Sequence, residues 1–156
     1  MKKILFLCHG NICRSPMARF IFEKLVTEAG LEKEFLIDSM AATDEEIGNP
    51  IYPAAARELR RRGVKMGEHR AAQITMADYR KFDLIVVMDD ENVRDLMRMT
   101  GNDPEKKVRR LMDYTDRPGE VSDPWYTGKF ALVYDDIFEG CSALLEAITG
   151  GRVLNV

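Results

Sequence analysis

No apolar run in the 156-residue chain approaches the roughly 20 residues that a membrane-spanning helix needs. An excess of one charge is also lacking, since 23 basic and 26 acidic residues give a formal net charge of −3. This balance creates no general attraction to nucleic acid or to a membrane surface, and we expect neither as a partner. The opening MKKILFLC starts with basic residues, but its apolar part is too short to be expected as a signal peptide.

Cysteine is scarce, with residues at positions 8, 13 and 141 only, and an odd count does not fit a disulfide framework. A second Cys or His pair at zinc-ligand spacing is missing as well, so we expect no metal at Cys8 and Cys13. Cys141 belongs to an apolar pattern at helical spacing and is expected to be a small core residue. A reactive thiol needs a reducing compartment, which indicates the cytoplasm.

The first 30 residues predict a strand, a tight loop and a helix. Residues 4–7 are apolar and follow lysines, which is typical of a buried parallel strand. Apolar side chains then recur at helical spacing over residues 18–29, and Gly30 supplies a stop. Ser15 is the expected N-cap of this helix, with Pro16 in its first position. The loop thus lies where α/β proteins bind ligands, at the carboxyl end of a strand.

This loop, CHGNICRS over residues 8–15, has the composition of a phosphate site. Its backbone N–H groups and the helix N-terminus can surround a tetrahedral oxyanion. Cys8 faces that positive field, so we expect it to lose its proton easily and to act as a nucleophile. Arg14 can hold two phosphoryl oxygens with its planar fork, and Ser15 can donate a hydrogen bond to the Cys8 sulfur. The spacing predicts phosphoryl transfer to sulfur.

Attack by Cys8 requires a proton donor for the leaving phenolate on the other side of phosphorus. Asp123, followed by Pro124 in a long loop, is the candidate for this general acid. Once deprotonated, the same carboxylate could activate the water that hydrolyses the phosphocysteine. The loop amides and Arg14 can neutralise the charge of the transition state, so we expect no metal and no cofactor.

These residues carry a resemblance to a known family. The run from Cys8 to Pro16 resembles the signature of the low-molecular-weight protein tyrosine phosphatases. The stretch DPWY at residues 123–126 is similar to the general-acid loop of that family. Further similarities, which extend the resemblance over essentially the whole chain, are Asp38-Ser39, Ile47-Gly48, His69 and Met88-Asp89. The resemblance implies hydrolysis of phosphotyrosine in protein substrates, with inorganic phosphate as the product.

The resemblance also implies a set of residues around the substrate, namely His9, Gly10, Asn11, Ile12, Cys13, Ser15, Glu45, Trp125 and Tyr126. It implies that Asn11 and Ser39 hold the loop open by hydrogen bonds, although Ser39 could instead bond its local backbone. Asp89 is expected to stabilise the edge of the site or to cap the next helix. Glu45 stands where many relatives carry an aromatic pocket wall, and Ala72 where many carry Arg.

Alternating strands and helices predict an α/β fold, with one three-layer domain over residues 1–156, a parallel sheet and helices on both faces. Besides the first unit, we expect strands at 35–39, 84–88 and 108–112, and helices at 54–62, 75–79, 90–99 and 129–149. Residues 40–53 and 116–128 are expected to be long loops, which are usually functional in a compact domain. The resemblance adds four strands in the order 2-1-3-4.

Three other functions stay open at this point. An arsenate reductase of the same fold would need further cysteines near residues 86–96, where the chain has none. An arginine-phosphate-specific relative would carry Thr where this chain has Ile12. A non-catalytic phosphate-binding or thiol-sensing module would not need an acid such as Asp123. Because Cys13 follows Cys8 in a curled loop, we also expect redox sensitivity through a Cys8–Cys13 disulfide, the alternative being that Cys13 only packs.

Overall fold

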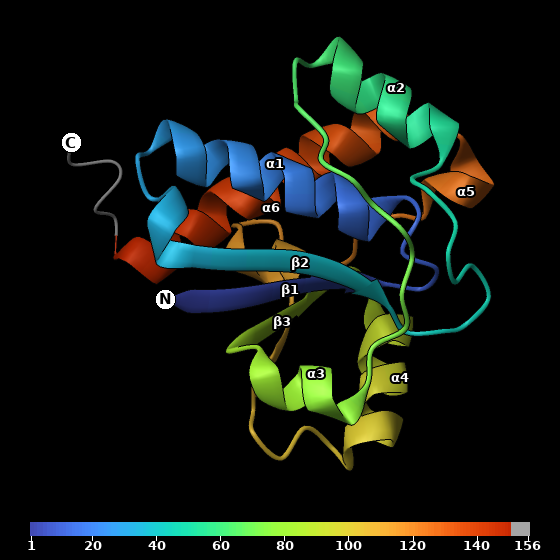
Figure 1. Cartoon of the computed structure of the whole chain (residues 1–156), viewed down its shortest axis with the longest axis vertical. Helices are drawn as coiled ribbons and strands as arrows, with labels where there is room; N and C mark the ends of the chain where they lie inside the picture. The colour runs from blue at the N-terminus through green and yellow to red at the C-terminus, as the bar shows by residue number, and fades with distance from the viewer. Residues whose placement is uncertain (151–156) are drawn as a thin grey trace.

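The computed structural model describes residues 1–150; residues 151–156 of the predicted domain lie outside the described part. Its centre is a parallel sheet of four strands, β1 (Lys2–Cys8), β2 (Phe35–Ala41), β3 (Leu84–Val87) and β4 (Val108–Arg110). The strands lie in the order β2-β1-β3-β4, which confirms the predicted topology. Figure 1 shows β2, β1 and β3 in this order. Four consecutive residues of β1, from position 4 to position 7, are buried, because both faces of the sheet are covered.

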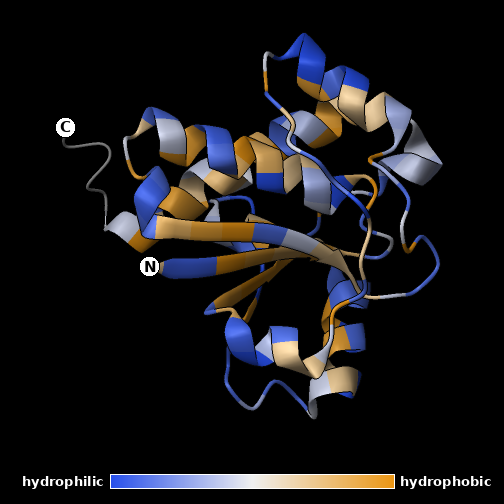
Figure 2. Cartoon of the chain, viewed as in Figure 1, coloured by the Kyte–Doolittle hydropathy of each residue, from blue (hydrophilic) through white to orange (hydrophobic). Residues whose placement is uncertain are grey.

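Two helical layers cover the sheet (Figure 1). On one face lie α1 (Arg14–Glu28) and α6 (Phe130–Thr149), with α2 (Pro53–Arg61) packed beside them. On the other face lie α3 (Met76–Lys81) and α4 (Asp90–Thr100). Alternate residues of β1 enter the two cores, Phe6 on the α1 side and Leu5 on the α4 side. Figure 2 shows strands that are largely apolar along their middle and helices that combine polar with apolar residues.

Most elements lie within two residues of their predicted bounds, and three details differ. Helix α1 begins at Arg14 with Cys13 as its N-cap residue, so the expected N-cap at Ser15 is wrong. The predicted loop 116–128 contains a short helix, α5 (Pro124–Thr127), capped by the Asp123 side chain. Strand β4 ends at Arg110, and the 3-10 helix η2 (Leu111–Tyr114) follows it; a second one, η1 (Glu32–Glu34), precedes β2. Cys141 is fully buried in the α1–α6 core, as predicted.

The sheet brings two helix starts to one edge. Strands β1 and β3 are parallel neighbours with Leu7 opposite Val87, so their carboxyl ends lie together. Helix α1 begins beyond the first strand and α4 beyond the third, and the loop before α5 reaches the same edge through the Val121 N–H, which donates to Met88 O at 2.8 Å. None of the helices in residues 1–150 combines the length and apolar character that crossing a bilayer requires.

Candidate active site

Asn11 holds the loop between β1 and α1 in its curled shape. Its φ of 61° lies in the left-handed region, which Asn tolerates better than most residues. Its Nδ2 donates to Ser15 Oγ at 2.8 Å and to Ser39 Oγ at 3.0 Å, and its Oδ1 accepts from Ala72 N at 3.2 Å. The side chain is fully buried, so it supports the loop from behind. The bond to Ser39 that the resemblance implied is present.

His69 braces the same loop from a distant segment. Its Nε2 lies 2.7 Å from the backbone oxygen of Asn11. Burial lowers the pKa of His69, which favours the neutral ring with the proton on Nε2, donated to that oxygen. His69 therefore has a structural partner in the phosphate loop.

The Cys8 sulfur lies at the base of the loop and receives two hydrogen-bond donors. Ser15 Oγ is 3.0 Å from Cys8 Sγ, and Ser15 N donates to the same sulfur at 3.4 Å. Since Ser15 Oγ already accepts a hydrogen bond from Asn11, its own proton is free to point at the sulfur. Ser15 therefore lies in the first turn of α1, with its hydroxyl and its N–H both directed at the Cys8 sulfur.

Arg14 is fixed by bonds on one side of its guanidinium. Nη1 donates to Asp89 Oδ2 at 2.7 Å and to the Val121 carbonyl at 2.8 Å, and the side chain is only 3% exposed. These two bonds use both protons of Nη1, which leaves the edge formed by Nε and Nη2 for an anion. That edge is the geometry with which arginine binds two oxygens of one phosphate.

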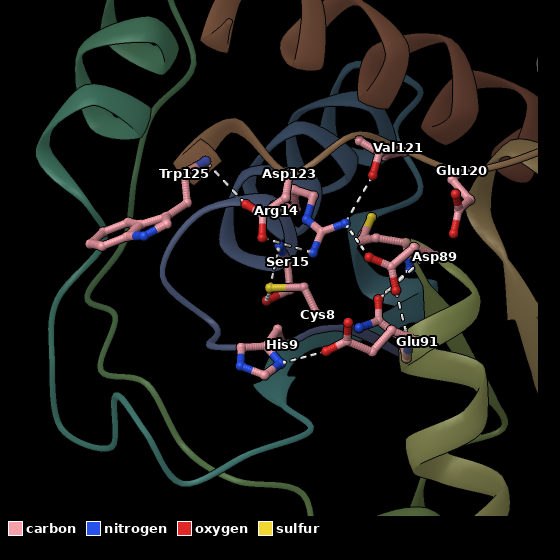
Figure 3. A network of polar contacts seen from close by, with 12 residues as sticks. Cys8, His9, Arg14, Ser15, Asp89, Glu91, Glu120, Val121, Asp123 and Trp125 are labelled. Atoms are coloured by element: carbon pink, nitrogen blue, oxygen red, sulfur yellow. Dashed lines mark hydrogen bonds and ion pairs between the residues drawn. The ribbon is translucent and has the colours of Figure 1, made fainter. Parts of the chain in front are cut away.

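Asp123 lines the same pocket as the loop and lies close to Arg14 (Figure 3). Its Oδ2 is 3.6 Å from Arg14 Nη2, and its Oδ1 accepts from Trp125 N at 3.1 Å. The side chain is 28% exposed, so one carboxylate can face both Arg14 and an incoming group.

Asp89 has two partners. Besides Arg14, it accepts a hydrogen bond from Asn92 N at 2.9 Å and so caps α4. Both expected roles of Asp89 are therefore compatible with its contacts.

The rim of the pocket is acidic around one histidine. Glu45 contacts the Nε2 atom of His9. On the other side of the ring, the carboxylate of Glu91 in α4 lies 3.2 Å from His9 Nδ1 (Figure 3). Ligand atoms of His9, Glu91 and Asp95 lie within 4.8 Å of one another and could hold a metal. Each of the three already has an ion-pair partner, that of Asp95 being Arg98.

A single pocket gathers most of the predicted site. Its lining residues are Cys8, His9, Gly10, Ile12, Cys13, Arg14, Glu45, Glu46, Asp123, Trp125 and Tyr126. Four predicted residues, Asn11, Ser15, Ser39 and Asp89, lie outside this lining and bond behind it. The sequence reasoning did not include Glu91 or the carbonyl of Val121. The only sequence signal for Glu91 was its position two residues after the predicted Asp89. The Val121 carbonyl belongs to the backbone, which has no sequence signal.

Cys13 lines the pocket but is only 5% exposed. Burial raises the pKa of its thiol to about 12, and the nearby Cys8 and Asp123 add to this effect. At neutral pH Cys13 is therefore a thiol. Its environment differs from that of Cys8, whose sulfur has two hydrogen-bond contacts with Ser15.

The chain is similar to known proteins over nearly its whole length. Residues 3–153 match the family model described as low molecular weight phosphotyrosine protein phosphatase. A low molecular weight protein-tyrosine-phosphatase of Bacillus subtilis, YfkJ, is 40% identical over 150 residues, 95% of this chain and 96% of the relative. The crystal structure of YfkJ superimposes with a TM-score of 0.93 at 39% identity, covering 96% of each chain. A Drosophila arginine phosphatase, 29% identical, has a TM-score of 0.85 over 95% of this chain and 98% of its own.

Proposed function

The chain belongs to the low molecular weight phosphotyrosine protein phosphatases, and from this premise we propose how it works: it hydrolyses phosphotyrosine in proteins, and other aryl phosphomonoesters, through a phosphocysteine at Cys8. It is a protein-tyrosine phosphatase, a hydrolase. One observation carries the mechanism, namely that Cys8, Arg14 and Asp123 line the same pocket.

In the first step the Cys8 sulfur attacks phosphorus, and the bond between phosphorus and the phenolic oxygen breaks. The Nε–Nη2 edge of Arg14, which Asp89 and the Val121 carbonyl leave open, holds two phosphoryl oxygens and stabilises the charge that develops on them. Asp123 gives its proton to the departing phenolate. Asp89 and the Val121 carbonyl fix the other side of the guanidinium, so Arg14 meets the phosphate already oriented.

In the second step water attacks the phosphocysteine while Asp123 takes a proton from that water. The sulfur–phosphorus bond breaks, inorganic phosphate forms, and the electron pair returns to Cys8. The hydroxyl and N–H of Ser15 both donate to the sulfur and so stabilise it as a leaving group.

The depth of the pocket supports an aryl phosphate as the substrate. Cys8 is 3% exposed, whereas Trp125 and Tyr126 at the rim are 53% and 85% exposed. The phenyl ring of phosphotyrosine extends the phosphate far enough to reach Cys8 while it contacts these aromatic side chains. A short phosphoserine side chain would bring the peptide backbone against the rim before its phosphate arrived.

Each of the other functions considered would need a chemical feature that this chain lacks, or would leave Asp123 without a role. An arsenate reductase would need resolving cysteines, but Cys141 is fully buried among core residues and Cys13 lies within the phosphate loop itself. An arginine-phosphate specificity, as named for the Drosophila relative, was associated with Thr at position 12, which is Ile12 here. A phosphate-binding module would have no use for Asp123 opposite the sulfur. A reactive Cys8 also agrees with a reducing compartment such as the cytoplasm.

Steady-state turnover of four substrates tests the proposal. We expect kcat/KM to be highest for an aryl phosphate and a phosphotyrosine peptide, and far lower for phosphoserine and phosphoarginine versions of the same peptide. Preferred turnover of the phosphoarginine peptide would overturn the aryl specificity. If the wild-type protein hydrolysed none of the four substrates, the phosphatase assignment itself would be overturned.

A further inference from the structure

Tyr52, which plays no part in the mechanism above, contacts two segments of the site and the start of α6. It lies directly before α2, and its N–H donates to the Ile12 carbonyl of the phosphate loop at 2.8 Å. Its ring packs edge-to-face on Trp125 of α5, with centroids 5.0 Å apart and planes at 62°. The same ring stacks on Phe130 at the start of α6, with centroids 5.9 Å apart and planes at 16°.

These contacts matter because of how Asp123 is held. Two residues before it, Val121 is anchored by its N–H to Met88 and by its carbonyl to Arg14. Two residues after it, Trp125 N donates to the Asp123 carboxylate. Asp123 therefore lies between a polar anchor at Val121 and whatever fixes Trp125.

On that second side the chain has few other anchors. Pro124 is buried, but residues 125–129 are all exposed. Among the contacts described, the aromatic packing on Tyr52 is the one that ties the Trp125 side chain to the body of the protein. Tyr52 itself is half-buried and packs against the α1–α6 core, so it is a firm support.

We propose that Tyr52 is a positioning residue for the proton-transfer step: its ring holds Trp125, and through Trp125 it holds Asp123 at the correct height above Cys8. The inference rests on the proposed function, in which Asp123 protonates the leaving group. Tyr52 does not touch the reacting atoms. Because its N–H also bonds to the phosphate loop, Tyr52 positions Asp123 relative to the loop that contains Cys8.

The test replaces Tyr52 with Leu, which keeps apolar bulk and the backbone N–H but removes the aromatic face. Turnover is measured with a series of aryl phosphates whose phenols differ in acidity. For a weakly acidic phenol we expect kcat to fall about tenfold, part of the roughly 10²–10⁴-fold that a general acid supplies. For a strongly acidic phenol, which leaves without a proton, we expect a change of less than about twofold. Tyr52→Phe keeps the aromatic ring, so this variant should retain wild-type rates with all of the phenols.

A double mutant separates positioning from general damage to the fold. If Tyr52 acts through the acid, then Tyr52→Leu should cause no further loss once Asp123→Asn is present. An equal loss for all phenols, or an undiminished loss in the Asp123→Asn background, would overturn the proposal. If Asp123→Asn alone showed no dependence on phenol acidity, the proposed acid role would fail instead, and the two failures can be told apart.

Two further measurements distinguish a local effect on α5 from a general effect of the substitution on the fold. Trp125 is the single tryptophan of the chain, so its fluorescence anisotropy reports directly on α5. We expect faster local motion of Trp125 in Tyr52→Leu than in the wild type, and unchanged motion would count against the proposal. Phe138→Leu is the matched control, because Phe138 belongs to another aromatic pair, with Tyr134 at 6.2 Å, away from the pocket lining. If Tyr52→Leu does not fold, Trp125→Leu removes the same contact from the other side and must give the same dependence on phenol acidity.

Discussion

The ion pair between Asp89 and Arg14 offers a prediction whose size follows from the contacts. Asp89→Ala removes the carboxylate that accepts from Arg14 Nη1 at 2.7 Å, in a pair whose side chains are 19% and 3% exposed. It also removes the oxygen that accepts from Asn92 N at 2.9 Å and caps α4. The substitution thus leaves a buried guanidinium without its main partner and a helix start without its cap.

Each loss has a typical free energy. Losing an N-cap destabilises a protein by about 1 kcal/mol. Removing one partner of a buried ion pair costs roughly 3–5 kcal/mol. The lower end applies here, because Arg14 keeps the Val121 carbonyl and lies 3.6 Å from Asp123. The free energy of unfolding should therefore fall by roughly 4 kcal/mol, which for a chain of this size lowers Tm by about 8–16 °C.

Thermal unfolding followed by circular dichroism measures this change, with two comparison variants. Asp89→Asn keeps an oxygen for the cap but loses the charge, so its Tm should fall less than that of the Ala variant. Asp90→Ala, one position along, removes a carboxylate that is 56% exposed and pairs with Arg110, and it should cost less than about 1 kcal/mol. A Tm of Asp89→Ala equal to that of Asp90→Ala would refute the reasoning.

Three further predictions concern the chemistry. Asp123→Asn should lower turnover of poor leaving groups by about 10²–10⁴-fold and affect a very acidic phenol much less, whereas an equal loss for both would remove Asp123 from the acid role. Peroxide should inactivate the enzyme reversibly through a Cys8–Cys13 disulfide, and Cys13→Ser should be inactivated irreversibly; mass spectrometry without that disulfide, and equal rescue by thiols, would refute this. Phosphotyrosine peptides with Lys or Arg flanks should be hydrolysed more efficiently than those with Asp or Glu flanks, because the rim is acidic, and Glu45→Tyr should reduce this preference while raising kcat/KM for simple aryl phosphates. Equal efficiencies at low salt would contradict the role of Glu45.

The sheet and the phosphate loop could be predicted because their signals are local. Residues 4–7 and 84–87 are apolar runs of strand length, and the loop joins a strand to a helix with Cys and Arg at a fixed spacing. Such patterns depend on neighbours in the sequence, so the chain itself contains them. The same holds for Cys141, whose burial follows from the period of the apolar residues around it.

What sequence reasoning missed depends on distant contacts or on competition between local rules. Ser15 is a good N-cap residue, but its hydroxyl bonds to Cys8 and Asn11 instead, and α1 starts two residues earlier than predicted. Helix α5 has only four residues, too few for a period, and its one signal was the Asp-Pro pair at its start. The contact of Tyr52 with Trp125 joins residues far apart in the chain, which no pattern within either segment indicates.

Trapping the phosphoenzyme tests the central claim most directly. The wild-type protein is mixed with an aryl phosphate, quenched within the first turnover, and mapped by mass spectrometry. The account predicts phosphate bound through sulfur to Cys8 and not to Cys13, and predicts that Cys8→Ser still folds and binds inorganic phosphate but has no turnover. Phosphate found on another residue, or substantial turnover by Cys8→Ser, would contradict it.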